Sequence, residues 1–226
     1  MLDNIDLDIP AGKVTAIVGA SGSGKTTLIK LMLGFYQPVS GEVAVNGTAL
    51  SRYSPGKWRR QCGVVMQEGF IFSDSIANNI SAVDEKPNRD QLEKAVTTAN
   101  IKEYIESLPL NYETKIGSDG HGLSSGQKQR LLMARAVYKD PDYLFFDEAT
   151  NSLDAENERQ IMKNLEQFFQ GRTVVVVAHR LSTVKNADQI IVLNKGKIVE
   201  RGNHKSLVNA QGAYYELIKN QLELGN

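Results

Sequence analysis

The stretch VTAIVGASGSGKTT, residues 14–27, decides the fold of this chain. Its first part, residues 14–18, is a compact apolar run, which is typical of a buried parallel strand. Residues 19–26, GASGSGKT, fit the pattern G-x-x-x-x-G-K-[ST], and residues 26–34 then have the apolar spacing of a helix. A loop of this kind between a buried strand and a helix predicts a P-loop fold.

The loop at residues 19–26 predicts nucleotide binding. Its glycines allow the backbone N–H groups to turn inward around phosphates, Lys25 can reach the β- and γ-phosphates, and the Thr26 hydroxyl can bind Mg²⁺. The alternative is a chance glycine- and serine-rich turn, expected roughly once in a hundred chains of this length. The expected nucleotide-binding residues of this region are Gly19, Ser21, Gly22, Ser23, Gly24, Lys25, Thr26 and Thr27.

Two carboxylates follow a second buried strand in YLFFDE, residues 143–148. Ligands of open α/β sheets bind where the strands end. We therefore expect Asp147 to bind the nucleotide, holding Mg²⁺ through water, and Glu148 to orient or deprotonate the attacking water. Taken alone, the pair is equally well explained as turn and helix-cap residues. Its combination with the loop favours the catalytic interpretation.

Charge, cysteine content and the length of the apolar runs bear on nucleic-acid binding, disulfide bonds and membrane spanning. The 226 residues include 26 Lys and Arg and 26 Asp and Glu, so the net charge of zero gives no indication of a nucleic-acid partner. Cys62 is the only cysteine, which rules out an internal disulfide. The longest apolar runs are too short to span a bilayer, so we expect the isolated domain to be soluble.

Strands alternate with helices along most of the chain, which predicts an α/β fold: a P-loop NTPase (RecA-like) core with a mostly parallel sheet. Helical spacing over residues 89–108, with no strong strand signal before residue 143, predicts an inserted α-helical subdomain at 74–134. The ATPase core then comprises residues 1–73 and 135–226. Further elements expected in this core are a turn at Asn46-Gly47, a strand at 64–67, an amphipathic helix near 156–169 and a C-terminal helix over about 214–224. Before that last helix we expect a hairpin with its turn at Lys195-Gly196.

The motifs GASGSGKT, LSSGQ, YLFFDE and AHR occur in the order found in the nucleotide-binding domain of ABC transporters, which this chain resembles over essentially its whole length. LSSGQ, residues 123–127, is similar to the family signature LSGGQ. In that family the signature contacts the γ-phosphate of ATP held by a second subunit. The resemblance therefore implies a head-to-tail dimer, here a homodimer, with two sandwiched ATP molecules. The residues implied to act in trans are Ser124, Ser125, Gly126 and Gln127, with Ser125 standing where the family usually has glycine.

The resemblance assigns three further residues. Gln67 matches a glutamine that contacts Mg²⁺ and the water, Asp154 matches an aspartate of the dimer interface, and His179 matches a catalytic histidine near the γ-phosphate. Taken alone, they would be a polar strand end, a helix N-cap and a structural histidine. The implied Mg²⁺ ligands are Thr26, Gln67 and, through water, Asp147, with ATP as the substrate.

The stretches FSDSIANNI, residues 72–80, and IGSDGHGLSSGQ, residues 116–127, resemble exporters, whose membrane and ATPase domains share one chain. The resemblance implies a transmembrane domain in the same parent polypeptide, contacting residues 117–122, and a place at the cytoplasmic face of a membrane, in bacteria the inner membrane. The family also stacks adenine on an aromatic residue before the loop. Residues 1–18 contain no aromatic residue, so we expect an N-terminally truncated β-subdomain and a fragment of a longer polypeptide.

Three alternatives stay open. The chain could be the ATPase subunit of an ABC importer. It could be a non-transport ABC ATPase of DNA repair or ribosome function, although the roughly one hundred residues between loop and signature contain no sustained heptads, which disfavours the repair type. It could be a regulatory binding module without catalysis, which Lys25, Glu148 and His179 argue against.

Overall fold

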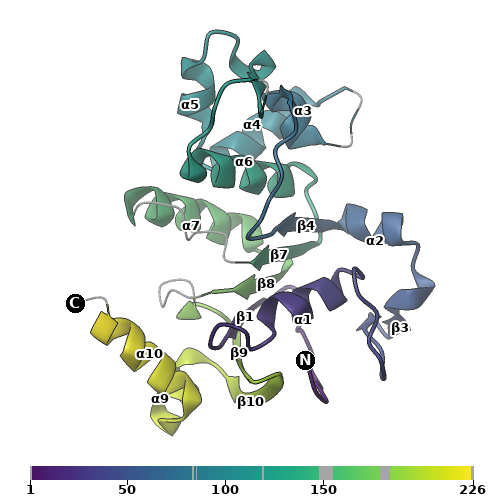
Figure 1. Cartoon of the computed structure of the whole chain (residues 1–226), viewed down its shortest axis with the longest axis vertical. Helices are drawn as coiled ribbons and strands as arrows, with labels where there is room; N and C mark the ends of the chain where they lie inside the picture. Colours follow the sequence, from purple (N-terminus) through teal and green to yellow (C-terminus); the bar gives the residue numbers. More distant parts are fainter. Residues whose placement is uncertain are drawn as a thin grey trace. The chain divides into compact units, whose positions relative to one another are not determined.

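A computed structural model describes residues 2–82, 84, 86–118, 120–147, 155–178 and 184–224 (Figure 1). The chain forms two compact units. The first comprises Met1–Arg60, Phe145–Glu148 and Gly171–Asn226, and the second comprises Gln61–Leu144 and Ala149–Gln170. The predicted division into an ATPase core and a helical subdomain at 74–134 has other boundaries and stays a prediction.

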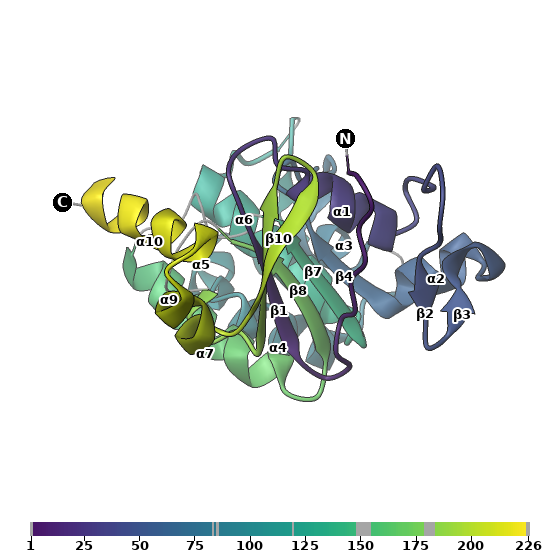
Figure 2. The same cartoon turned by 90° about the horizontal axis from the view of Figure 1, so that it is seen from below.

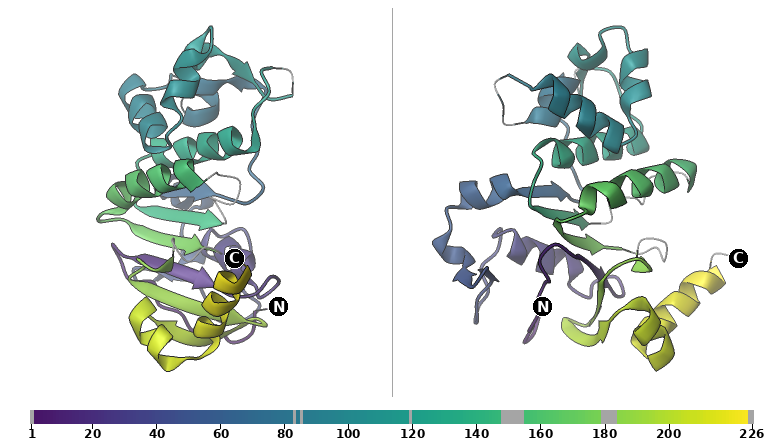
Figure 3. Two further views of the ribbon diagram at one scale, coloured as in Figure 1. Left: turned by 90° about the vertical axis from the view of Figure 1, so that its left-hand side faces the viewer. Right: turned by 180° about the vertical axis from the view of Figure 1, so that it is seen from behind.

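A mostly parallel sheet forms the centre of the first unit. The strands of this sheet that the first unit holds are β1 (Val14–Val18), β7 (Tyr143–Asp147, from Phe145 on), β8 (Thr173–Val177), β9 (Gln189–Asn194) and β10 (Lys197–Gly202). They lie in the order β10-β9-β1-β8-β7. Strand β1 pairs in parallel with both β8 and β9, while β10 runs antiparallel to β9. Figure 3 shows β1, in purple, between strands coloured green. The predicted α/β class is confirmed.

Continuous apolar runs produce β1, β7, β8 and β9, which are buried on both faces. Strand β10, KIVERG, instead alternates exposed and half-buried residues. Ala16 and Ile17 of β1 are fully buried, and so is Val174 of β8. Helix α1 (Lys25–Met32) contacts β8 and buries Leu28 and Ile29. The helix predicted at 26–34 is thereby confirmed.

Two hairpin turns of the first unit are of the type expected from sequence. Lys195 and Gly196, between β9 and β10, have φ of 46° and 81°. Asn46 and Gly47 have φ of 49° and 74° and join β2 (Ala44–Val45) to β3 (Thr48–Ala49), which form a separate small sheet. Two consecutive positive φ values are the requirement of a tight two-residue hairpin, and glycine meets it at the second position.

Among its described residues, the first unit also contains the helical segments η1 (Leu50–Arg52), α2 (Pro55–Gln61), α9 (His204–Ala210) and α10 (Ala213–Leu224). The carboxylate of Glu200 in β10 accepts hydrogen bonds from the N–H groups of Ala213 (2.6 Å) and Tyr214 (2.9 Å) at the start of α10. Figure 2 shows α9 and α10 beside β10. The predicted C-terminal helix is confirmed, whereas the short α9 gave no usable signal in the sequence.

The second unit is mainly helical. It contains α3 (Ile76–Ser81), α4 (Arg89–Thr98), α5 (Lys102–Ser107), η2 (Asn111–Glu113), α6 (Ser125–Tyr138) and α7 (Ala155–Phe169), with strands β4 (Cys62–Val65), β5 (Asp74–Ser75) and β6 (Lys115–Ile116). Helices α3 and α4 both pack on α6. Strand β4 begins and ends two residues earlier than the strand predicted at 64–67. The pair β5–β6 was not predicted, because two residues are too few to show alternation.

Within the described part of the chain, no helix combines the length and the apolar character needed to cross a membrane.

Candidate functional site

Three glycines give the loop after β1 its shape. Gly19, Gly22 and Gly24 have φ of 152°, 75° and 107°, conformations that residues with a side chain rarely adopt. At Gly19 a Cβ atom would also lie 2.1 Å from the carbonyl oxygen of Leu193, so no side chain fits there. At Gly22 a Cβ atom would meet nothing within 4 Å. The loop is therefore held tightly at its first residue and is open at its middle.

The ammonium group of Lys25 lies inside the loop. Lys25 is the first residue of α1 and is only 5% exposed. Its Nζ donates hydrogen bonds to the backbone oxygens of Gly19 (2.8 Å) and Ala20 (3.0 Å). A positive charge in this position, beside the N-terminus of a helix, favours an anion.

The hydroxyl of Ser23 is buried without a hydrogen-bond partner among the described residues, and the residue is 3% exposed. A buried hydroxyl in this state indicates a missing polar group, which a phosphate oxygen would supply. Thr26 is half-buried at the start of α1, while Ser21 and Thr27 are exposed. These side chains and the loop's N–H groups fit the phosphates of a nucleotide.

Asp147 is the last residue of β7 and is fully buried. Its strand belongs to the same sheet as β1, with β8 between them. Among the described residues, no group of three or more His, Cys, Asp or Glu gathers as a metal site. One carboxylate and one threonine hydroxyl are oxygen donors, which fit Mg²⁺ when phosphates and water complete its ligands.

The loop and the end of β8 emerge at the same edge of the sheet. Ile17 is paired with Val177, and the N–H of Ala178 donates to the oxygen of Ile17 at 3.3 Å. His179 would follow directly, but it lies outside the described residues, as do Glu148 and Asp154.

Gln67 belongs to the second unit, two residues beyond the end of β4, and its side chain is exposed.

The LSSGQ stretch also belongs to the second unit and begins α6. Ser124 is the N-cap: its Oγ accepts from the N–H of Gln127 (3.2 Å), and Oε1 of Gln127 accepts from the N–H of Ser124 (2.8 Å). Ser124 and Ser125 are exposed, and Gly126 and Gln127 are half-buried. This reciprocal capping was missed from the sequence, although the spacing S-x-x-Q is its signal.

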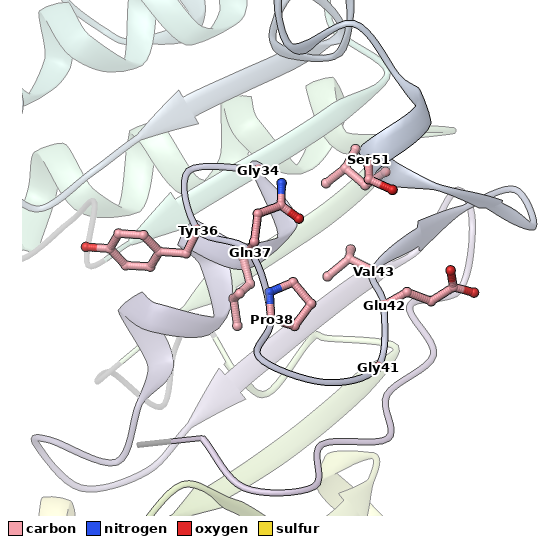
Figure 4. Close-up of a pocket in the computed structure, with 10 residues that line it drawn as sticks. Gly34, Tyr36, Gln37, Pro38, Gly41, Glu42, Val43 and Ser51 are labelled. Atoms are coloured by element: carbon pink, nitrogen blue, oxygen red, sulfur yellow. The ribbon is translucent and has the colours of Figure 1, made fainter.

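A hollow of about 100 Å³ lies elsewhere in the first unit (Figure 4). It is lined by Leu31 of α1, by residues 34, 36–38 and 41–43 of the chain after α1, and by Leu50 and Ser51 of η1. The phosphate-binding loop precedes the opposite end of α1, so this hollow is not the nucleotide cradle.

Comparisons with known proteins agree on one family. A model of the ABC transporter family matches residues 2–151. The ATP-dependent lipid A-core flippase of Haemophilus influenzae is 46% identical over 217 residues, which are 96% of this chain and 37% of the flippase. The alpha-hemolysin translocation ATP-binding protein HlyB of Escherichia coli is 46% identical over 218 residues, which are 96% of this chain and 31% of HlyB. The chain thus spans about a third of the length of these relatives.

A solved structure of a bacterial Atm1-family ABC exporter with ATP bound is similar in fold. The TM-score is 0.92 at 36% sequence identity, and the match covers 97% of this chain and 38% of the exporter chain.

Proposed function

This chain belongs to the ABC transporter family, and we propose that it is the ATP-binding and ATP-hydrolysing motor domain of a membrane exporter. The observation that carries the proposal is the loop in which Lys25 is buried and its ammonium is held at the carbonyls of Gly19 and Ala20. In this proposal the loop residues 19, 21–27 and Asp147 bind ATP. The helical subdomain is residues 74–134, and the ATPase core is 1–73 and 135–226.

Mg²⁺ is the proposed cofactor, held by the Thr26 hydroxyl, by Gln67 and through water by Asp147. When bound, it neutralises charge that develops on the β- and γ-phosphates. Glu148 then acts as the base or orienting group for water, with His179 and Gln67 as the other catalytic residues. The buried, partnerless hydroxyl of Ser23 supports a phosphate in the loop.

The proposed assembly is a head-to-tail homodimer in which residues 124–127 of one copy contact the ATP of the other, with Asp154 at the interface. Exposure of Ser124 and Ser125 at the start of α6 supports this role, because a second copy can reach them. The partner in transport is a transmembrane domain, so the motor acts at the cytoplasmic face of a membrane. The relatives' greater length supports a membrane domain carried on the same polypeptide.

The relatives and the solved structure named above are exporters. This favours an exporter over an ABC importer and over a non-transport ATPase of DNA repair or ribosome function.

Two substitutions separate ATP binding from hydrolysis. Lys25→Ala removes a phosphate contact and should abolish ATP turnover. Glu148→Gln keeps the shape but removes the base, so turnover should fall by roughly 10²-fold or more while ATP still binds. The measurements are phosphate release and binding of a fluorescent ATP analogue.

Glu216→Gln is the matched control, because Glu216 is an exposed residue of α10 and its change removes the same charge. It should leave turnover unchanged. Near-normal hydrolysis by Glu148→Gln would rule out the catalytic role of Glu148.

A further inference from the structure

Arg135, in the eleventh position of α6, bonds a segment of chain that is remote in sequence. Its Nη1 donates to the backbone oxygen of Phe70 (2.8 Å) and its Nε to that of Asn79 (2.7 Å), while Nη2 donates to Oδ1 of Asn79 (3.1 Å). The guanidinium carbon also lies 5.2 Å from the ring centre of Phe72. Burial lowers the pKa of Arg135, yet an arginine stays charged in proteins. These are therefore charge-assisted hydrogen bonds.

Asn79 of α3 continues the same network. Its side chain is fully buried, and Nδ2 donates to the backbone oxygens of Phe72 (2.9 Å) and Ser75 (3.1 Å). Its Oδ1 accepts from the N–H of Phe72 at 2.9 Å. The turn between residues 70 and 75 is thus wrapped around one amide, which Arg135 in turn orients.

Gly69 brings the same segment into close contact with α6. A Cβ atom at Gly69 would lie 2.1 Å from Cδ1 and 3.0 Å from Cγ of Leu132, a buried residue of α6. Its φ is not in the left-handed region, so closeness to the helix, and not backbone conformation, favours glycine here: a larger residue would require the side chain of Leu132 to shift.

The segment is also bonded to the stretch that leads into α6. Asp74 and Ser75 of β5 pair with Ile116 and Lys115 of β6, and the hydroxyls of Ser73 and Ser118 lie 2.8 Å apart. The chain from Gly69 to Ser75 is therefore bonded or packed both against the body of α6 and against the residues before its start.

We infer that Arg135 is a positioning residue, which fixes the segment from Gly69 to Ser75 on the helix that begins with the signature, so that Gln67, two residues before this segment, moves together with residues 124–127. The inference rests on the proposed function for the roles of Gln67 and the signature. Arg135 lies eight positions beyond Gln127 on α6, a rise of about 12 Å, so it acts through the segment and not on the nucleotide.

A lysine cannot replace Arg135 fully, because its ammonium group is a point charge, whereas the planar guanidinium donates to three acceptors at once. Arg135→Lys should hold one or two of the carbonyls and have an intermediate effect, whereas Arg135→Gln should release the segment. Arg130→Gln is the matched control, since Arg130 lies on the same helix and its Nη1 donates to the oxygen of Asn100 (2.7 Å), outside the segment.

Hydrogen exchange of the nucleotide-free chain tests the linkage itself. The amide of Phe72 should exchange about tenfold faster or more in Arg135→Gln, less so in Arg135→Lys, and at the wild-type rate in Arg130→Gln. Unchanged exchange in Arg135→Gln would overturn the inference. If that variant does not fold, the same comparison is made with Arg135→Lys.

A double-mutant cycle on ATP turnover tests the positioning role. The rate is measured per bound ATP. Arg135→Gln should lower kcat about fivefold when Gln67 is present and less than twofold in a Gln67→Ala background. The effect is smaller there because Arg135 acts on turnover through Gln67. A purely structural loss would lower kcat equally in both backgrounds and would overturn the inference. A wild-type chain that binds ATP but never hydrolyses it would overturn the proposed function, and hydrogen exchange would still decide the linkage.

Discussion

The thiol of Cys62 is buried at the start of β4. Burial raises its pKa to about 12, and the nearby charge of Lys139 offsets only part of that effect. Because the pKa is higher in the folded chain, the protonated thiol makes its full contribution to the free energy of folding below its ordinary pKa of 9.0. That contribution is lost as the pH rises through the folded pKa of about 12. The thiolate is the reactive form of cysteine, so the folded chain should be nearly inert to thiol reagents.

Alkylation of Cys62 by iodoacetamide at pH 8 should therefore report unfolding. The folded chain has on the order of a thousandfold fewer thiolates than the unfolded chain at this pH, and its labelling should be slower to match. The control is the same chain in concentrated urea at the same pH, followed by mass spectrometry. Equal labelling rates in both conditions would contradict the burial of this side chain.

The sequence predicted the roles of residues that act with neighbours in the chain. It did not predict the roles of residues whose partners are distant in the chain. The glycines and Lys25 of the loop act within one eight-residue motif. The partners of Arg135 lie 56 and 65 positions away, so no local pattern could reveal them. Ser124 is a third case. The spacing S-x-x-Q indicates its capping role, but the same residues were interpreted only as the family signature.

At the scale of single elements, α6 depends on its cap. Ser124→Ala removes the side-chain acceptor for the N–H of Gln127 and should cost about 1 kcal/mol of folding free energy. For a chain of this size that corresponds to a fall in the unfolding midpoint of roughly 2–4 °C. Thermal unfolding followed by circular dichroism measures it.

Ser125→Ala is the control for the cap, because Ser125 is the first residue of α6 and not its N-cap. Its effect on the midpoint should be clearly smaller. An equal fall in both variants would mean that the reciprocal bonds of Ser124 and Gln127 add little to the stability of α6.

Length explains which elements the sequence predicted. The strands β1, β7 and β8 have five residues each, and α7 has fifteen, so their periodicity is visible. The strands β5 and β6 have two residues each, and α9 has seven. Elements that short are stabilised by tertiary contacts rather than by their own pattern. The turns at 46–47 and 195–196 were the exception, since glycine marks them directly.

At the scale of the whole molecule, the proposed dimer can be tested through Ser124. The substitution Ser124→Arg should leave ATP binding to the monomer unchanged, because the phosphate-binding loop is untouched. It should block closure of the dimer, since a long side chain would fill the space for the other copy's γ-phosphate. A Glu148→Gln background keeps ATP bound, and sedimentation at high protein concentration, with and without MgATP, measures association.

In that background, the chain with its natural Ser124 should form an ATP-dependent dimer, and the chain with Ser124→Arg should remain monomeric. A dimer that persists with arginine at position 124 would mean that LSSGQ serves only to begin α6.

The place of β1 in the sheet has a consequence for the order of events during protein synthesis. Both neighbours of β1 come from residues 173–194, and the N–H of Gly12 bonds the hydroxyl of Thr173, 161 positions later. A ribosome needs roughly 8 to 30 seconds to translate that distance. Through this interval the nascent chain carries the apolar run VTAIV without either of its partner strands, exposed to cellular chaperones and to aggregation. The nucleotide loop is translated directly after this run, and it gains its supporting strands only when residues 173–194 have been made.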